Sequence, residues 1–148
     1  MPEWSGILQG VQYHGMDISN AMLDLGANLT RDIPILTEWH DSWPTLSEKT
    51  PTLFLFSFLF GNLNDAKAEK LAEDVVAHIS NSGQPAVGLI QNSIREDRNY
   101  ATDAFLGRLR QLGDYLLLDE GFAEIQYKTT SSSDIKSCDV LFHRFILT

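Results

Sequence analysis

The residues best suited to acid–base or metal chemistry in this chain are its four histidines. They are His14, His40, His78 and His143. No two of them are three or four residues apart, so the helical spacing of common zinc motifs is missing. His14 with Asp17, and His40 with Asp41, could each supply half of a site that the fold completes, although scattered His and Asp residues more often lie at the surface or cap helices. We therefore assign no catalytic residue and no metal ligand.

Nucleophiles and phosphate loops give no stronger pattern. Ser57 lies inside an apolar run and lacks the Gly-x-Ser-x-Gly frame that exposes a catalytic serine. Cys138 is the only cysteine, and a lone cysteine is more often inert than reactive. Residues 61–65 (GNLND) contain one glycine, no lysine and an acid at the expected helix start, which is unsuited to a phosphate. We expect no bound metal, nucleotide or other cofactor.

Composition limits the partners and the compartment. The chain has 148 residues, a formal net charge of −9 and a hydrophobic fraction of 43%. Such a negative field repels phosphate backbones, so direct nucleic-acid binding is not expected. One cysteine cannot form an internal disulfide, and the first residues lack the pattern of a signal peptide. No apolar run reaches the ~20 residues of a membrane span, so we expect a cytoplasmic protein without membrane contact.

The elements that must position any site are organised around residues 51–61, PTLFLFSFLFG. Aromatic richness and the flanking Pro and Gly predict a central strand over 53–60 that is buried on both faces, with Phe54, Phe56 and Phe58 in the core. The amphipathic pattern that follows predicts a helix from Asn64 to a left-handed stop at Gly83. A second buried strand over 86–90 should pair with the first in parallel, through a right-handed crossover.

The remaining pattern predicts about three helices and a mixed sheet in one globular domain, 1–148, of the α/β or α+β class. A first helix, capped by Asp17 or Ser19, should bury the stripe of Ile18, Met22, Leu25 and Leu29. The other expected features are a possible arm over 1–16, an extended segment over 35–39, a loop over 40–50, a helix ending near Gly113, a turn at 119–121 opening a C-terminal antiparallel hairpin, a polar loop over 129–138 and a last strand over 139–147.

This order of elements resembles the small tail-terminator, or tail-completion, proteins of tailed phages. The resemblance is architectural and covers most of the chain: a leading helix, the strand introduced by Pro51, an amphipathic helix and a closing β pair at 122–147. It implies a non-enzymatic, ring-forming subunit, located in the virion if phage-encoded. It carries no site residue to this chain.

Surplus apolar surface points in the same direction, toward a structural or assembly protein that forms a homo-oligomer or binds a protein partner. The last strand is apolar on both faces and stands at the chain end, where we expect an edge strand that a second copy covers. The residues expected at this interface are Trp39, Trp43, Phe142 and Ile146. Two alternatives stay open: an acidic immunity or inhibitor protein that docks a basic partner, and a small enzyme that uses His14, His40 and nearby carboxylates.

Overall fold

The computed structural model describes residues 10–17, 19–33, 35–44, 51–95, 99–128 and 134–148. Contacts divide the chain into two compact units, Met1–Leu46 and Ser47–Thr148. Three helices and two sheets confirm the expected mixture of α and β structure. Among the described helices, none combines the length and the apolar character that crossing a membrane requires.

The first unit is a strand, a helix and a second strand. β1 (Gln12–Met16) pairs in parallel with β2 (Leu36–His40), and α1 (Asn20–Thr30) connects them. β2 and α1 agree with the expected elements, whereas β1 falls where the sequence suggested an arm. The expected core stripe of α1 is wrong, because its described members Met22, Leu25 and Leu29 are exposed.

The contacts of Trp39 explain why α1 packs on the strands with a face other than the stripe of Met22, Leu25 and Leu29. A Cβ added at Gly15 of β1 or at Gly26 of α1 would overlap with the Trp39 indole. The indole Nε1 also donates a hydrogen bond of 3.2 Å to Thr30 Oγ1 on α1. The two glycines therefore let strand and helix close on one large ring, which sets the packing of this unit.

The second unit contains a four-stranded sheet of order β3-β4-β6-β5. Its elements are β3 (Thr52–Ser57), the short helix η1 (Phe60–Asn62), α2 (Asp65–Ser82), β4 (Ala86–Ser93), α3 (Tyr100–Leu112), β5 (Tyr115–Lys128) and β6 (Ile135–Leu147). β3 and β4 are parallel, and β6 runs antiparallel between β4 and β5. The parallel pair joined by a helix confirms the strand–helix–strand pattern expected from the sequence.

The capping residues of α2 also agree with the sequence. The Asn64 side chain accepts a hydrogen bond of 2.9 Å from the Lys67 amide, which satisfies one free N–H of the first turn. At the other end Gly83 adopts the left-handed conformation with φ 65°, and its N–H donates to the Ile79 carbonyl. Local chemistry alone therefore sets both ends of this helix.

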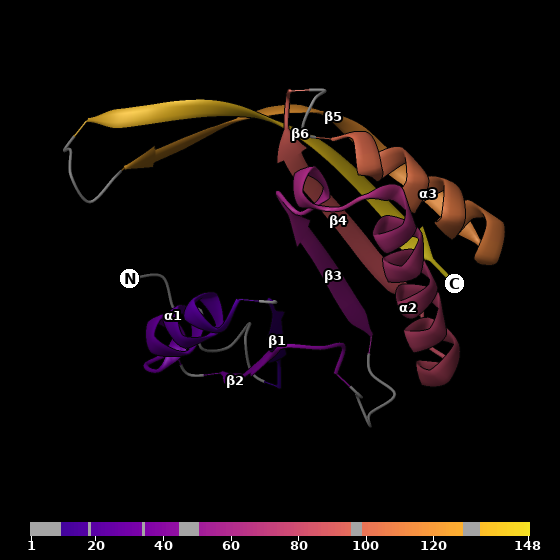
Figure 1. Ribbon diagram of the computed structural model, residues 1–148, viewed down its shortest axis with the longest axis horizontal. Coiled ribbons are helices and arrows are strands. Elements are labelled where there is room, and N and C mark those ends of the chain that lie inside the picture. Colours follow the sequence, from indigo (N-terminus) through magenta and orange to yellow (C-terminus); the bar gives the residue numbers. More distant parts are fainter. Residues whose placement is uncertain (1–9, 18, 34, 45–50, 96–98, 129–133) are drawn as a thin grey trace. The chain divides into compact units, whose positions relative to one another are not determined.

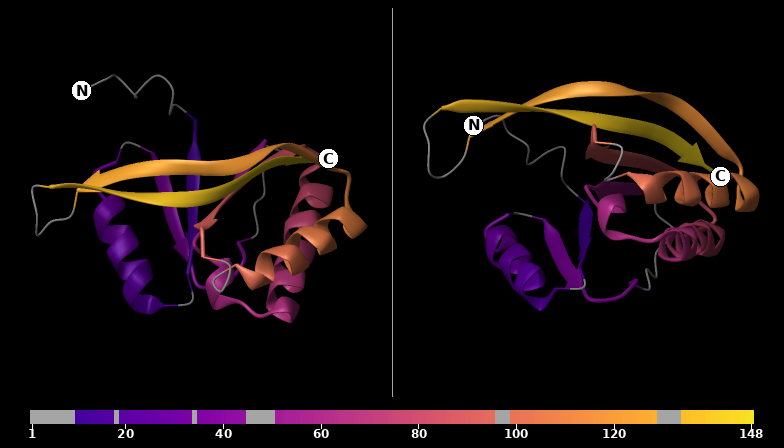
Figure 2. Two further views of the ribbon diagram at one scale, coloured as in Figure 1. Left: turned by 90° about the horizontal axis from the view of Figure 1, so that it is seen from above. Right: turned by 45° about the horizontal axis from the view of Figure 1, so that its top comes forward.

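The core of the second unit lies between one face of the sheet and the helix pair. α2 and α3 lie on the same side of the sheet in each view (Figures 1 and 2). Phe56 of β3, Phe60 of η1 and Phe105 of α3 form an aromatic cluster with ring centroids 4.9–6.0 Å apart. Gly88 is required beneath Phe145, because a Cβ there would enter the phenyl ring. The aromatic contacts hold η1 and α3 on the sheet.

Three expectations about the strands are wrong. β3 stands at the edge of its four-stranded sheet, and Leu53, Leu55 and Phe58 are 66%, 56% and 48% exposed, so the run is not a strand buried on both faces. The chain does not turn at 119–121, because β5 continues through a bulge near Leu118. β6 is an interior strand, which removes the premise of an edge at the chain end.

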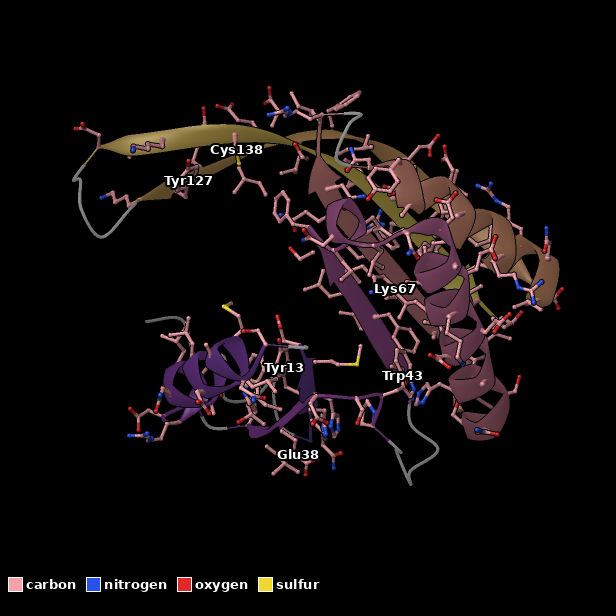
Figure 3. The ribbon with its side chains drawn as sticks, viewed as in Figure 1. Tyr13, Glu38, Trp43, Lys67, Tyr127 and Cys138 are labelled. Carbon is pink, nitrogen blue, oxygen red and sulfur yellow. The ribbon has the colours of Figure 1, made fainter. Side chains whose placement is uncertain are left out.

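The β5–β6 ribbon extends past the rest of the sheet. Pairing of β6 with β4 ends at Val140, whereas pairing with β5 continues to Ile135. Residues 135–138 therefore belong to a strand and not to the expected polar loop, of which 129–133 lie outside the described residues. Figure 3 shows Tyr127 and Cys138 on this ribbon, and both are exposed.

We expect Phe56→Ala to lower the free energy of unfolding by about 3–5 kcal/mol, because it empties the centre of the aromatic cluster. Phe56 is only 6% exposed. Leu55→Ala on the neighbouring residue is the matched control and should cost about 0.5 kcal/mol or less, as is usual for surface positions. Urea unfolding followed by circular dichroism measures both, and equal losses would contradict this core.

Burial lowers the pKa of His78 below the ordinary value, so the folded protein resists protonating this ring. The unfolded chain takes up the proton near pH 6.5, and stability should therefore fall as the pH drops from about 7.5 to about 5.5. His78→Gln should show a smaller fall than the wild type in urea unfolding at the two pH values. Parallel losses in the two proteins would rule out His78 as the cause.

Candidate functional site

Asp17 occupies the position directly after the carboxyl end of β1. Its backbone N–H donates to the His40 carbonyl at 3.1 Å, which holds the loop against the last residue of β2. Its Oδ1 accepts a hydrogen bond of 2.8 Å from the amide of Ser19, the N-cap residue of α1. An ionised carboxylate offers about four acceptor sites, so Asp17 retains capacity to accept donors from a ligand.

The position matters because parallel strands joined by helices bind ligands outside their carboxyl ends. In that arrangement an acidic residue after a strand accepts hydrogen bonds from ribose hydroxyls of a nucleoside cofactor. Asp17 has the residue type and the position for this task. The sequence interpretation considered Asp17 only as a helix cap or as a partner of His14, because β1 was not recognised.

A second group of side chains lies on β1 and β2 of the same unit. His14 Nδ1 is 3.0 Å from His40 Nε2, and these atoms are 3.4 Å and 3.7 Å from Glu38 Oε2. The two imidazole rings are stacked, with centroids 5.3 Å apart. The fold thus unites His14 with His40, as the enzyme alternative required, and adds Glu38, which the sequence did not single out.

The strand register explains this group. His14 lies opposite Glu38, and Met16 lies opposite His40. Side chains alternate between faces, so the two histidines and the glutamate share one face while Gly15 and Trp39 share the other, which packs on α1. In Figure 3 the labelled Glu38 projects away from α1, in agreement with this alternation.

In the second unit the carboxyl ends of β3 and β4 carry a strained residue and buried amides. Phe58 has φ 52°, an uncommon conformation for a bulky side chain, and its N–H donates to the Gln91 carbonyl at 2.7 Å. Asn92 is 1% exposed and donates from Nδ2 to Thr102 Oγ1 at 3.0 Å. Its Oδ1 has no hydrogen-bond partner among the described residues. Strain and unsatisfied polar atoms recur at functional sites, and this end of the strands shows both.

The two remaining histidines, His78 and His143, contact side chains of their own unit. His78 packs edge-on against Phe54 at 5.5 Å, and its Nε2 is 3.2 Å from Thr52 Oγ1. His143 Nδ1 lies 2.7 Å from Glu120 Oε2 on the neighbouring strand. A mostly apolar hollow of about 320 Å³ lies near Gly83, at the amino end of β4, and is therefore at the opposite end of the strand from Asn92.

The residues expected at an interface occupy different settings. The Trp39 indole packs inside the first unit, between α1 and β1. Trp43, Phe142 and Ile146 are each half-buried. Whether any of them contacts a second copy or a protein partner remains a prediction.

Neither a protein-family model nor a curated protein sequence matches this chain. Three solved structures do share its fold. A structure described with the conversion of a disulfide bond into a thioacetal group during echinomycin biosynthesis has a TM-score of 0.64 at 12% identity, over 94% of this chain and 67% of that chain. The Pnkp1/Rnl/Hen1 RNA repair complex gives 0.53 at 12%, over 93% of this chain and 31% of that chain. The PH0226 protein from Pyrococcus horikoshii OT3 gives 0.55 at 10%, over 99% and 76%.

These matches are methyltransferase-like proteins. Similarity at this identity describes the fold alone, and the neighbours that share it are enzymes and not structural subunits. The expectation of a non-enzymatic structural protein, with its phage-tail and virion-assembly role, is therefore wrong, and the small-enzyme alternative fits better. No comparison tests the architectural resemblance to tail terminators itself or the expected partners.

We expect Thr102→Val to lower the free energy of unfolding by about 1–3 kcal/mol, because the isosteric change leaves the buried Asn92 amide without its acceptor. Ser93→Ala is the comparison, because Ser93 is the last residue of β4, next to Asn92, and is half-buried. Its hydroxyl accepts a hydrogen bond of 3.2 Å from the exposed Arg95 amide. Urea unfolding should show the larger loss for Thr102→Val, and no loss would mean that solvent replaces the bond.

Proposed function

We propose that this chain is a methyltransferase-type enzyme, or part of one, that binds S-adenosylmethionine through Asp17. The support comes from two independent sources. The fold is similar to that of methyltransferase-like proteins. Asp17 stands directly after the carboxyl end of β1, where a carboxylate can accept hydrogen bonds from both hydroxyls of a ribose. The position of Asp17 is the observation that carries the proposal, because a fold alone does not establish a function.

The local structure of Asp17 fits this role. The hydrogen bond from the Ser19 amide fixes the carboxylate, and the backbone bond to the His40 carbonyl fixes the loop. A ligand-binding group that is already held loses less conformational entropy when the ligand binds. Asp17 therefore combines a suitable charge with a preorganised position.

The missing phosphate loop does not argue against this cofactor. A glycine-rich loop with a lysine is needed to bind phosphate groups, and S-adenosylmethionine has none. The donor is instead a cation at its sulfonium, and the net charge of −9 favours its approach. The proposal thus replaces the expectation that the chain binds no cofactor.

When bound, this cofactor would supply an electrophilic methyl group. The described residues would then hold its ribose through Asp17. The second unit, taken by itself, has Phe58 and Asn92 at the carboxyl ends of β3 and β4, where sheets of this kind bind ligands. We propose a small or positively charged acceptor for the methyl group, because the negative field opposes a nucleic-acid substrate.

We expect the full chain to bind S-adenosylmethionine, and Asp17→Asn to weaken binding by roughly 10–100-fold, the loss typical of a hydrogen bond to a charged group. Asp24→Asn is the matched control, since Asp24 is exposed on α1, and it should bind as the wild type does. Isothermal titration calorimetry with the donor and with S-adenosylhomocysteine measures both constants. Absence of wild-type binding at millimolar donor, or equal binding by Asp17→Asn, would overturn the proposal.

A further inference from the structure

We propose that His14, Glu38 and His40 form a binding site for a divalent transition-metal ion, with zinc as the metal that their chemistry suits best. The site lies on one face of the β1–β2 pair. One atom from each side chain lies within 4.8 Å of the others. The inference is independent of the proposed methyl transfer, because it uses other side chains of this unit.

The distances match the geometry of a bound ion. Protein ligands stand 2.0–2.2 Å from zinc, so in a tetrahedral site they are roughly 3.3–3.6 Å from one another. The observed separations are 3.0 Å between His14 Nδ1 and His40 Nε2, and 3.4 Å and 3.7 Å from these nitrogens to Glu38 Oε2. Shifts of a few tenths of an ångström, together with a rotation of the two imidazole rings, would therefore accommodate the ion.

The backbone holds the three ligands ready. Glu38 and His40 are two residues apart on β2, so their side chains project from the same face, and His14 lies across from Glu38 on the parallel strand β1. The opposite face of both strands is packed on Trp39. Ligands carried on paired strands are positioned more accurately than ligands on loops.

The donor set selects the kind of ion. Imidazole nitrogens suit zinc, copper, iron and nickel, whereas magnesium and calcium prefer sites made of oxygen atoms alone. Two histidines and one glutamate are also the protein ligands of several catalytic zinc sites, in which water takes the fourth position. Side-chain exposures of 17% for His14, 24% for His40 and 49% for Glu38 leave room for that water.

Hydrogen bonding is the competing explanation for this cluster. A proton on one ring could bridge the two imidazole nitrogens, since one neutral imidazole can donate to another. That arrangement leaves the Glu38 carboxylate beside the accepting lone pair of the other ring. A cation could satisfy all three groups together once the imidazole rings turn toward it, because each group offers a lone pair and the three atoms lie within 4.8 Å of one another. We therefore favour the metal over the bridging proton.

The test uses the full chain with Cys138→Ser, which removes the exposed thiol as a zinc ligand. After chelator treatment and dialysis against zinc, elemental analysis should find one zinc ion per chain. His14→Ala and His40→Ala should each weaken zinc binding by more than about 100-fold, measured by competition with a chromophoric chelator. Glu69→Gln, at an exposed glutamate on α2, should leave the affinity unchanged.

A second measurement does not depend on the variants being folded. Cobalt added to the chain that carries only Cys138→Ser should give the intense visible absorption of a tetrahedral or five-coordinate site. Added zinc should then displace the cobalt and remove this absorption. His143→Gln alters a histidine–glutamate pair that has no third ligand within the described part of the chain, and this variant should keep the spectrum. Substoichiometric zinc, octahedral cobalt absorption alone, or unchanged affinity in a His14→Ala/His40→Ala double variant would overturn the metal site.

The metal and donor proposals can fail separately. Asp17→Asn should retain zinc while it loses S-adenosylmethionine, and His14→Ala should lose zinc while it retains the donor. Far-UV circular dichroism of the metal-free variants checks that each is folded. Loss of both ligands in a folded Asp17→Asn protein would show that the loop after β1 is needed for the whole unit, and it would overturn the independence stated here.

Discussion

Parallel pairing of β1 with β2 is the constraint on which both proposed sites depend. The pairing sets His14 opposite Glu38 and ends both strands at the same side, where Asp17 meets the His40 carbonyl. It is held from one face by Trp39, whose indole fills the space left by Gly15 and Gly26. With one face committed to packing, the polar side chains of the two strands are collected on the other. The metal ligands and the packing ring thus follow from a single register.

The second unit obeys a different constraint, which is aromatic packing between the sheet and two helices. The rings of Phe56, Phe60 and Phe105 join β3, η1 and α3, and Gly88 makes room for Phe145 of β6. This packing covers one face of the sheet and leaves the carboxyl ends of β3 and β4 at its margin. There Phe58 has a positive φ, and Asn92 Oδ1 has no hydrogen-bond partner among the described residues, two features that recur at functional sites.

The expectation of a non-enzymatic assembly protein was wrong for a clear reason. A continuous catalytic motif is not required for catalysis, because active sites in sheets of this kind are built from residues at the ends of separate strands. Such residues are far apart in sequence and carry no common spacing. The missing phosphate loop argues against phosphate binding at residues 61–65. It does not argue against a cofactor that has no phosphate group.

Elements whose ends are set by local interactions could be predicted from the sequence. Asn64 and Gly83 end α2 through hydrogen bonds made within a few residues, and the patterns at β3, β4 and α3 were strong enough to predict the parallel pair and the fold class. Strand order, with β3 at a sheet edge and β6 in the interior, could not be predicted, because it depends on which strands find partners far along the chain. Only the tertiary structure decided that His14 and His40, separated by 26 residues, meet at Glu38. A short strand such as β1 has little periodicity of its own, and its register becomes defined only when it pairs with β2.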